Sequence, residues 1–137
     1  MTVKKEVKMK EKNIGKGKNI LVIEDDNSIL NMYKTSLTND GYSVFTAVNG
    51  EDGLKIAQKE IPDLVLLDVM MPQVDGFAVL EQLKAESATD KIPVIMLTNL
   101  AQEEDRERGK KLGAKDYLVK SNLTPMQVSE KIKKYIK

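Results

Sequence analysis

Five short apolar runs alternate with amphipathic segments along the chain, and this order constrains the possible fold more than any other feature. The runs read NILVIE, YSVFTA, DLVLL, PVIML and KDYLV, and their β-branched and leucine residues predict strands. Apolar residues at helical spacing follow the first run, namely Ile29, Tyr33 and Leu37. Strands that alternate with helices predict an α/β fold, a doubly wound parallel sheet covered by helices on both faces.

Capping signals mark several of the expected helices. Asn49 is a candidate N-cap for the segment GEDGLKIAQK. The segment TPMQ, which starts at Thr124, combines a capping box with a proline at the first helical position. A very polar helix is expected from about Ala101 to Leu112, closed by Gly113. Apolar residues at Phe77, Leu80 and Leu83 mark the helix after the third strand, and Val128, Ile132 and Ile136 form the apolar stripe of the last helix.

The chain has no histidine and no cysteine among its 137 residues. Disulfides and thiolate metal sites are therefore excluded, and so are the commonest general base and the commonest ligand of transition metals. Any chemistry must use carboxylates, hydroxyls, lysines and the backbone. A bound metal should consequently be a hard cation that prefers oxygen, such as Mg²⁺.

Positive charge is concentrated at the start of the chain. Residues 1–18 carry seven lysines and two glutamates, a net charge of +5, whereas the rest carries −4. We expect a basic flexible tail over 1–18 and a single domain over 19–137. No secretory signal is evident, and no apolar stretch approaches the roughly 18 residues that a membrane span requires.

Polar residues stand at the ends of four of the predicted strands. Glu24 and Asp25 follow the first strand, Asp68 the third, Thr98 ends the fourth, and Lys120 follows the fifth. In a doubly wound fold the functional crevice lies at these carboxyl ends. Close carboxylates repel by about 4 kcal/mol per pair at an effective dielectric of about 20, so their convergence requires compensating cations. A divalent ion together with Lys120 would bring the cluster close to neutral.

The segments ILVIEDD, DLVLLDVMMPQVDG, PVIMLT and YLVK resemble the four signature segments of the response-regulator receiver domain. The separations of 30 residues from Asp68 to Thr98 and 52 residues from Asp68 to Lys120 also match that family. The resemblance extends over about residues 19–137. It implies a flavodoxin-like fold with five helices around a five-stranded parallel sheet in the order 2-1-3-4-5.

The resemblance also implies roles for individual residues. Asp68 would be the phosphoacceptor, and it would hold Mg²⁺ together with Glu24, Asp25 and the backbone carbonyl of Met70. Asp26, one position past the acidic pair, would instead cap the first helix.

Three further residues would respond to the phosphoryl group. Thr98 and Lys120 would each contact a phosphoryl oxygen. Tyr117 matches the aromatic position whose rotamer follows that threonine.

By the same resemblance, the phosphoryl donor would be a sensor histidine kinase or a histidine phosphotransfer protein. The chain would act in the cytoplasm as a stand-alone switch that binds a downstream effector protein, through the face of the last two helices with Tyr117. No direct binding to nucleic acid is expected. The protein would be no enzyme beyond catalysing its own phosphorylation and dephosphorylation.

Two departures from the family pattern carry expectations of their own. Ser121 follows Lys120 where the family usually has a proline, so a trans peptide bond and a differently placed loop are expected. Met70 and Leu100, which should flank the path of the hydrolytic water, are both apolar. Slow loss of the phosphoryl group is one expectation, and packing of these residues against a partner is the alternative.

Other functions remain open from the sequence alone. The chain could be a receiver cut from a larger regulator, or an interaction module that works without phosphorylation. A phosphatase with an aspartate nucleophile is disfavoured, because Met70 stands where a second aspartate would be needed. No G-x-G-x-x-G follows the first strand, which disfavours a dinucleotide-binding protein.

Overall fold

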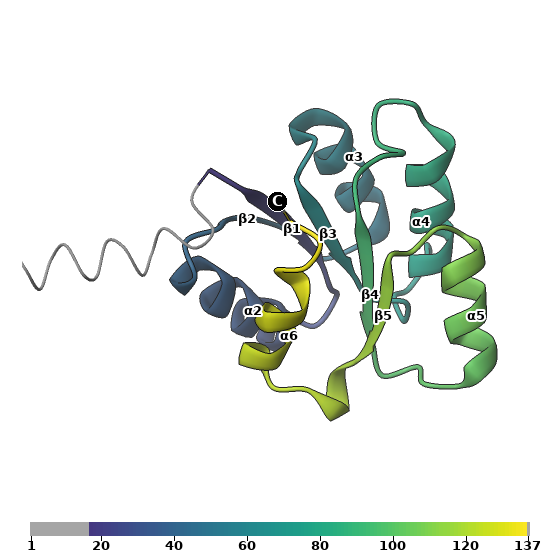
Figure 1. Cartoon of the computed structure of the whole chain (residues 1–137). Coiled ribbons are helices and arrows are strands. Elements are labelled where there is room, and N and C mark those ends of the chain that lie inside the picture. The colour runs from purple at the N-terminus through teal and green to yellow at the C-terminus, as the bar shows by residue number, and fades with distance from the viewer. Residues whose placement is uncertain (1–16, 137) are drawn as a thin grey trace, which may run out of the picture.

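The computed structural model describes residues 17–136, and within them five parallel strands form one sheet (Figure 1). Their order across the sheet is β2-β1-β3-β4-β5, so the predicted fold class and strand order are confirmed. The expected tail lies outside the described residues, apart from its last two positions. The strands are β1 (Asn19–Ile23), β2 (Ser43–Ala47), β3 (Leu64–Leu67), β4 (Val94–Thr98) and β5 (Asp116–Val119).

Helices cover both faces of this sheet (Figure 1). Two of them, α2 and α6, pack on one face, while α3, α4 and α5 lie on the other. A short 3₁₀ helix, η2, follows β5. The bounds are α2 (Asn27–Asn39), α3 (Gly50–Glu60), α4 (Gly76–Ala85), α5 (Glu103–Lys111), η2 (Lys120–Asn122) and α6 (Pro125–Ile132).

The central strands are apolar along their whole length because both of their faces are buried. In β3, Leu64 and Leu66 enter the core beneath α2 and α6, whereas Val65 and Leu67 enter the core beneath α3 and α4. All four side chains are almost fully buried. Side chains that alternate between two cores leave no strand position for a polar group until the strand ends.

The capping signals in the sequence are confirmed. Asp26 accepts a hydrogen bond from the Ile29 N–H at 3.0 Å and caps α2, and Asn49 caps α3. The capping box at Thr124 is complete, with both of its reciprocal hydrogen bonds formed.

Two helices, α5 and α6, are shorter than the sequence predicted. The polar helix α5 begins at Glu103, after Gln102, whose side chain makes no capping hydrogen bond. α6 ends at Ile132, so Ile136 packs against the core from beyond the helix.

A strained residue ends α3. Ile61 has φ of 43° and ψ of 66°, in the left-handed region, where an L-residue costs about 1–2 kcal/mol. Because its side chain is 46% exposed, little packing depends on it. We therefore expect Ile61→Asn to raise the free energy of unfolding by about 1 kcal/mol in urea denaturation. Lys59→Asn, at an exposed helical position, is the control and should not stabilise. A less stable Ile61→Asn protein would contradict this account.

Candidate functional site

Three carboxylates meet at the carboxyl edge of the sheet. Because β1 pairs with β3 and Ile23 lies opposite Leu67, the residues that follow these strands are neighbours. Oxygen atoms of Glu24, Asp25 and Asp68 all lie within 4.8 Å of one another. Glu24 and Asp68 are only 3% and 6% exposed, while Asp25 faces solvent. The convergence predicted from the strand ends is therefore present.

Lys120 lies between the two buried carboxylates. Its ammonium group forms ion pairs with Glu24 and with the Asp68 carboxylate, the latter at 3.2 Å from Oδ2. Burial raises the pKa of Glu24 to about 7, although the hydrogen bond from Lys120 opposes this shift. Burial alone would lower the pKa of Lys120, but its hydrogen bond with Glu24 and the charge of Asp68 together raise it. The lysine thus remains charged and offsets part of the carboxylate repulsion.

A tight loop after β3 holds Asp68 at this edge. The Met70 N–H donates to Asp68 Oδ1 at 3.3 Å, which orients the carboxylate. The Gly76 N–H donates to the carbonyl of Val69 at 2.9 Å, so the first residue of α4 returns to the loop. The side chain of Met70 points outward and is 60% exposed. The N-terminal end of α4 therefore lies directly against the backbone that carries Asp68.

The residues of this site fit a hard divalent cation. Three carboxylates supply oxygen donors within a span that one ion can bridge, and oxygen is the donor that Mg²⁺ prefers. Their combined negative charge exceeds what Lys120 alone can balance. The Met70 carbonyl as a fourth protein ligand stays a prediction.

Thr98 and Tyr117 both bind the backbone of the loop that follows β4. Thr98 is fully buried, and its hydroxyl accepts a hydrogen bond from the Leu100 N–H at 3.3 Å. Tyr117 is 8% exposed, and its hydroxyl donates to the Leu100 carbonyl. Burial raises the pKa of Tyr117 to about 12, so the phenol stays protonated. The two predicted switch residues are thus joined through Leu100.

Comparison with known proteins identifies the family to which this arrangement belongs. The family model for the response regulator receiver domain matches residues 20–133. The chain belongs to the response-regulator receiver family. Among solved structures, this receiver domain is similar to Vibrio cholerae chemotaxis protein CheY4, with 31% identity and a TM-score of 0.82. That match covers 87% of this chain and 98% of the CheY4 chain.

Two other proteins place this receiver domain among its relatives. The probable transcriptional regulator ycf27 of Porphyra purpurea is 45% identical over 118 residues, which are 86% of this chain and 47% of that protein. The chain thus spans about half the length of the curated relatives it matches. The BeF3-activated N-terminal receiver domain of Klebsiella pneumoniae RstA is 26% identical with a TM-score of 0.79. The match covers 85% of this chain and 97% of that one.

A hydrogen bond that the sequence did not suggest joins the loop after β4 to η2 in the receiver domain. The Ser121 N–H donates to Asn99 Oδ1 at 2.9 Å. No cis peptide bond occurs in the part of the chain that the structure describes, so the expected trans bond between Lys120 and Ser121 is confirmed. The only sequence signal was the serine that replaces the usual proline, because serine retains a backbone N–H.

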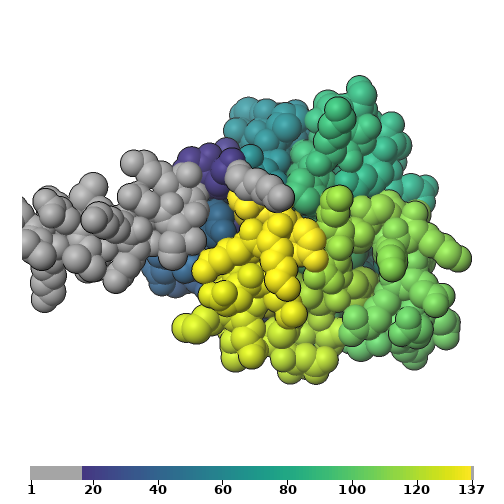
Figure 2. Space-filling view, in the orientation of Figure 1, coloured from purple at the N-terminus to yellow at the C-terminus, as the bar shows by residue number. Residues whose placement is uncertain are grey.

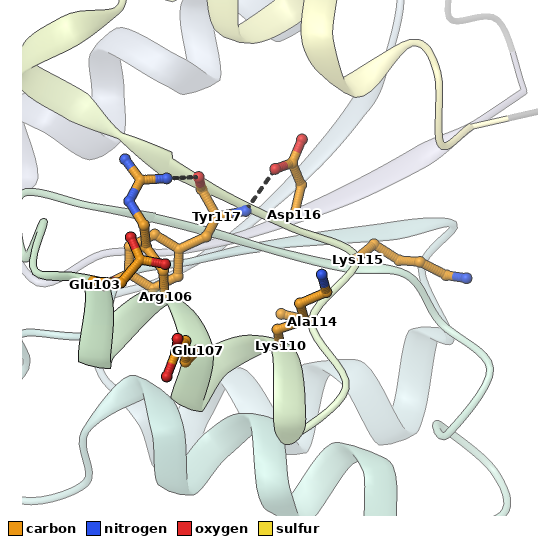
Figure 3. A pocket seen from close by; sticks show the side chains of 8 residues that line it. All are labelled: Glu103, Arg106, Glu107, Lys110, Ala114, Lys115, Asp116 and Tyr117. Atoms are coloured by element: carbon orange, nitrogen blue, oxygen red, sulfur yellow. Dashed lines mark hydrogen bonds between the residues drawn. The ribbon is translucent and has the colours of Figure 1, made fainter.

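A groove of about 450 Å³ lies between α5 and β5, close to Tyr117 (Figure 3). Arg106 lies over the Tyr117 ring, 5.6 Å from its centroid, and donates to the Tyr117 carbonyl at 3.4 Å. Figure 3 also shows Lys115 pointing away from α5. On this face of the molecule α6 and α5 lie on either side of β5 (Figure 2). The surface expected to dock an effector is therefore grooved on its α5 side.

Among the helices of residues 17–136, none has the length and apolarity that would let it span a lipid bilayer.

Proposed function

We propose that this receiver domain accepts a phosphoryl group on Asp68 from a phosphohistidine of a sensor kinase or phosphotransfer protein, in a Mg²⁺-dependent reaction. The observation that carries the proposal is the buried Asp68 carboxylate, grouped with Glu24, Asp25 and Lys120 at one sheet edge. Phosphoryl transfer requires chiefly positioning and neutralisation of oxygen charge, and this cluster suits both needs.

The chemistry follows from the groups at hand. A carboxylate oxygen of Asp68 attacks phosphorus, the bond from phosphorus to the donor imidazole nitrogen breaks, and an acyl phosphate forms. Bound Mg²⁺ would neutralise charge on the phosphoryl oxygens. Glu24 and Asp25 would hold the ion together with Asp68. Lys120 exchanges part of its contact with the carboxylates for a phosphoryl oxygen.

The phosphoryl group would then act as a switch on the β4 and β5 side of the domain. Thr98 turns its hydroxyl from the Leu100 N–H toward a phosphoryl oxygen, and the loop moves inward with it. The Tyr117 hydroxyl then loses its acceptor, the Leu100 carbonyl, and the Tyr117 side chain moves with the loop. Because Tyr117 lines the α5 groove, the surface offered to an effector changes.

We further propose that this domain acts in the cytoplasm and that its output is a contact with an effector protein. Residues 19–137 carry a net charge of −4, which disfavours direct binding to nucleic acid. The chain turns over no other substrate: it catalyses only its own phosphorylation and dephosphorylation. It would act as a stand-alone regulator or as the receiver part of a longer one.

Incubation with a small phosphodonor and Mg²⁺, followed by intact-mass measurement, tests this proposal. We expect one added phosphoryl group in the wild type and none in Asp68→Asn. Asp75→Asn is the matched control, since Asp75 caps α4 in the same region and asparagine caps equally well. Incorporation that persists in Asp68→Asn would refute the acceptor assignment. No incorporation in the wild type would favour an interaction module that works without phosphorylation.

The lifetime of the phosphorylated form is a separate prediction. Met70 and Leu100 line the same surface hollow beside the Asp68 loop, and neither side chain can orient a water molecule. We expect slow loss of the phosphoryl group, and a decay about tenfold faster in Met70→Asn or Leu100→Glu, because one hydrogen bond that orients the attacking water is worth about that factor in rate. Decay is followed by intact mass after donor removal. Met32→Asn, at an exposed position of α2, is the control. Unchanged decay in both variants would indicate that these residues serve packing alone.

A further inference from the structure

The loop that follows β4 and the 3₁₀ helix η2 that follows β5 are joined by a side chain immediately beside the phosphoacceptor site. Asn99 directly follows Thr98, and Ser121 directly follows Lys120. The hydrogen bond from the Ser121 N–H to Asn99 Oδ1 spans 2.9 Å and links positions 22 residues apart. It therefore connects the neighbours of the two residues that would contact the phosphoryl group.

The same loop is attached to β5 at a second point. The Leu100 carbonyl accepts the Tyr117 hydroxyl, and Tyr117 lies near the start of β5. The Leu100 N–H in turn donates to the Thr98 hydroxyl. Thr98 at the end of β4 and the two loop residues that follow it thus bind one another or the β5 side of the domain, at Tyr117 and again just beyond Lys120.

We propose that Asn99 is a positioning residue, which fixes the loop of Lys120 relative to Thr98 and takes over the task that a proline after the lysine performs in the family pattern. This inference rests on the proposed function, because it assigns Lys120 and Thr98 to the phosphoryl oxygens. A proline at position 121 would restrict the backbone through its ring but offer no N–H. Serine leaves the backbone freer, and the Asn99 carboxamide restores the constraint from outside the loop.

The expected size of the effect follows from the exposure of the two residues. Asn99 and Ser121 are both exposed, so water competes for their hydrogen bond. Such a bond contributes modestly to overall stability, and its loss leaves no buried polar group unpaired. The consequence should be a less favourable placement of Lys120, seen as about fivefold weaker binding of a phosphoryl mimic.

Titration with beryllofluoride in the presence of Mg²⁺ tests the inference, with binding followed by NMR. Beryllofluoride is a phosphoryl mimic, and a BeF3-activated form is known for the related RstA receiver domain. We expect Asn99→Ala to weaken the apparent affinity about fivefold and to shift the Lys120 resonances. Asn122→Ala, a nearby exposed asparagine in η2, is the control and should bind as the wild type does.

A double-mutant cycle with Ser121→Pro separates positioning from other roles of Asn99. Because proline lacks the donor, Asn99→Ala in the Ser121→Pro background should change affinity by less than about twofold. Equal losses in both backgrounds, or no loss in the native background, would overturn the inference.

Hydrogen exchange at the Ser121 amide reports on the bond without any ligand. It should be slowed in the wild type and fast in Asn99→Ala. An amide that exchanges fast in the wild type would overturn the inference, whatever the affinities. If the wild type protects this amide yet fails to bind beryllofluoride through Asp68, the proposed function fails and the positioning role falls with it.

Discussion

Replacement of Lys120 by methionine should destabilise the Mg²⁺-free protein by about 3 kcal/mol, because removal of one partner leaves buried charges uncompensated. Lys120 is paired with Glu24 and Asp68, and these side chains are 3% and 6% exposed. Methionine preserves most of the aliphatic length of the side chain, so the loss comes mainly from charge. Lys91→Met, at an exposed position, is the control and should change stability by less than about 0.5 kcal/mol.

Mg²⁺ should restore much of the stability that Lys120→Met loses. A cation that binds only the folded state stabilises it in proportion to its affinity, and affinity should rise when the competing ammonium group is absent. Urea denaturation of the variant and the wild type, in Mg²⁺ and in a chelator, measures the stability that the substitution costs and the stability that the ion restores. Equal Mg²⁺ stabilisation in the variant and the wild type would show that Lys120 and the ion do not compensate the same charges.

The loss of stability in Lys120→Met should also depend on pH, because Glu24 changes its ionisation. Its pKa in the folded wild type is about 7, above the ordinary value of 4.5, so the folded state binds this proton more tightly than the unfolded state. Its contribution to stability therefore falls as pH rises from about 4.5 to about 7. Without Lys120 the pKa of Glu24 should rise further. The cost of the substitution should thus be larger at about pH 8 than at about pH 6.

The fold and the edge that carries the site could be predicted because their signals are local. Apolar runs that end in Glu24, Asp68 and Thr98 indicate buried strands whose polar residues begin where burial stops. To predict that these polar residues converge, one must also know that β1 and β3 are neighbours. That strand order came from the family resemblance. The order is confirmed, and with it the meeting of Glu24 and Asp68.

Other features could not be predicted because they depend on where distant loops run. The bond between Asn99 and Ser121 crosses 22 residues and has no periodic or capping signal. Ile61 adopts a left-handed conformation that usually requires glycine or asparagine. An isoleucine at this position therefore predicts a different backbone conformation from the one observed. The roles of Met70, Thr98 and Tyr117 stay predictions, since they concern a phosphorylated state.

Gly76→Ala should be among the most damaging single substitutions in this domain. A Cβ at Gly76 would lie 2.1 Å from the Asp68 carbonyl oxygen and 2.7 Å from the Val69 Cα. Both are backbone atoms, so relief requires movement of the loop that presents Asp68 or of the start of α4. We expect a loss of about 3 kcal/mol in the free energy of unfolding, at the upper end of overpacking costs, measured by urea denaturation.

The same substitution should impair phosphorylation in the molecules that remain folded. Any shift of the Asp68 backbone moves its carboxylate relative to Glu24 and Lys120, and misplacement by about 1 Å can cost roughly a hundredfold in rate. Gly109→Ala is the matched control, because its added Cβ would meet side chains and no backbone, the Tyr117 ring at 3.1 Å and the Met96 side chain at 3.6 Å, and alanine favours the helix. If Gly76→Ala were as stable and as readily phosphorylated as Gly109→Ala, the close approach of α4 to the Asp68 backbone would not be what positions the acceptor.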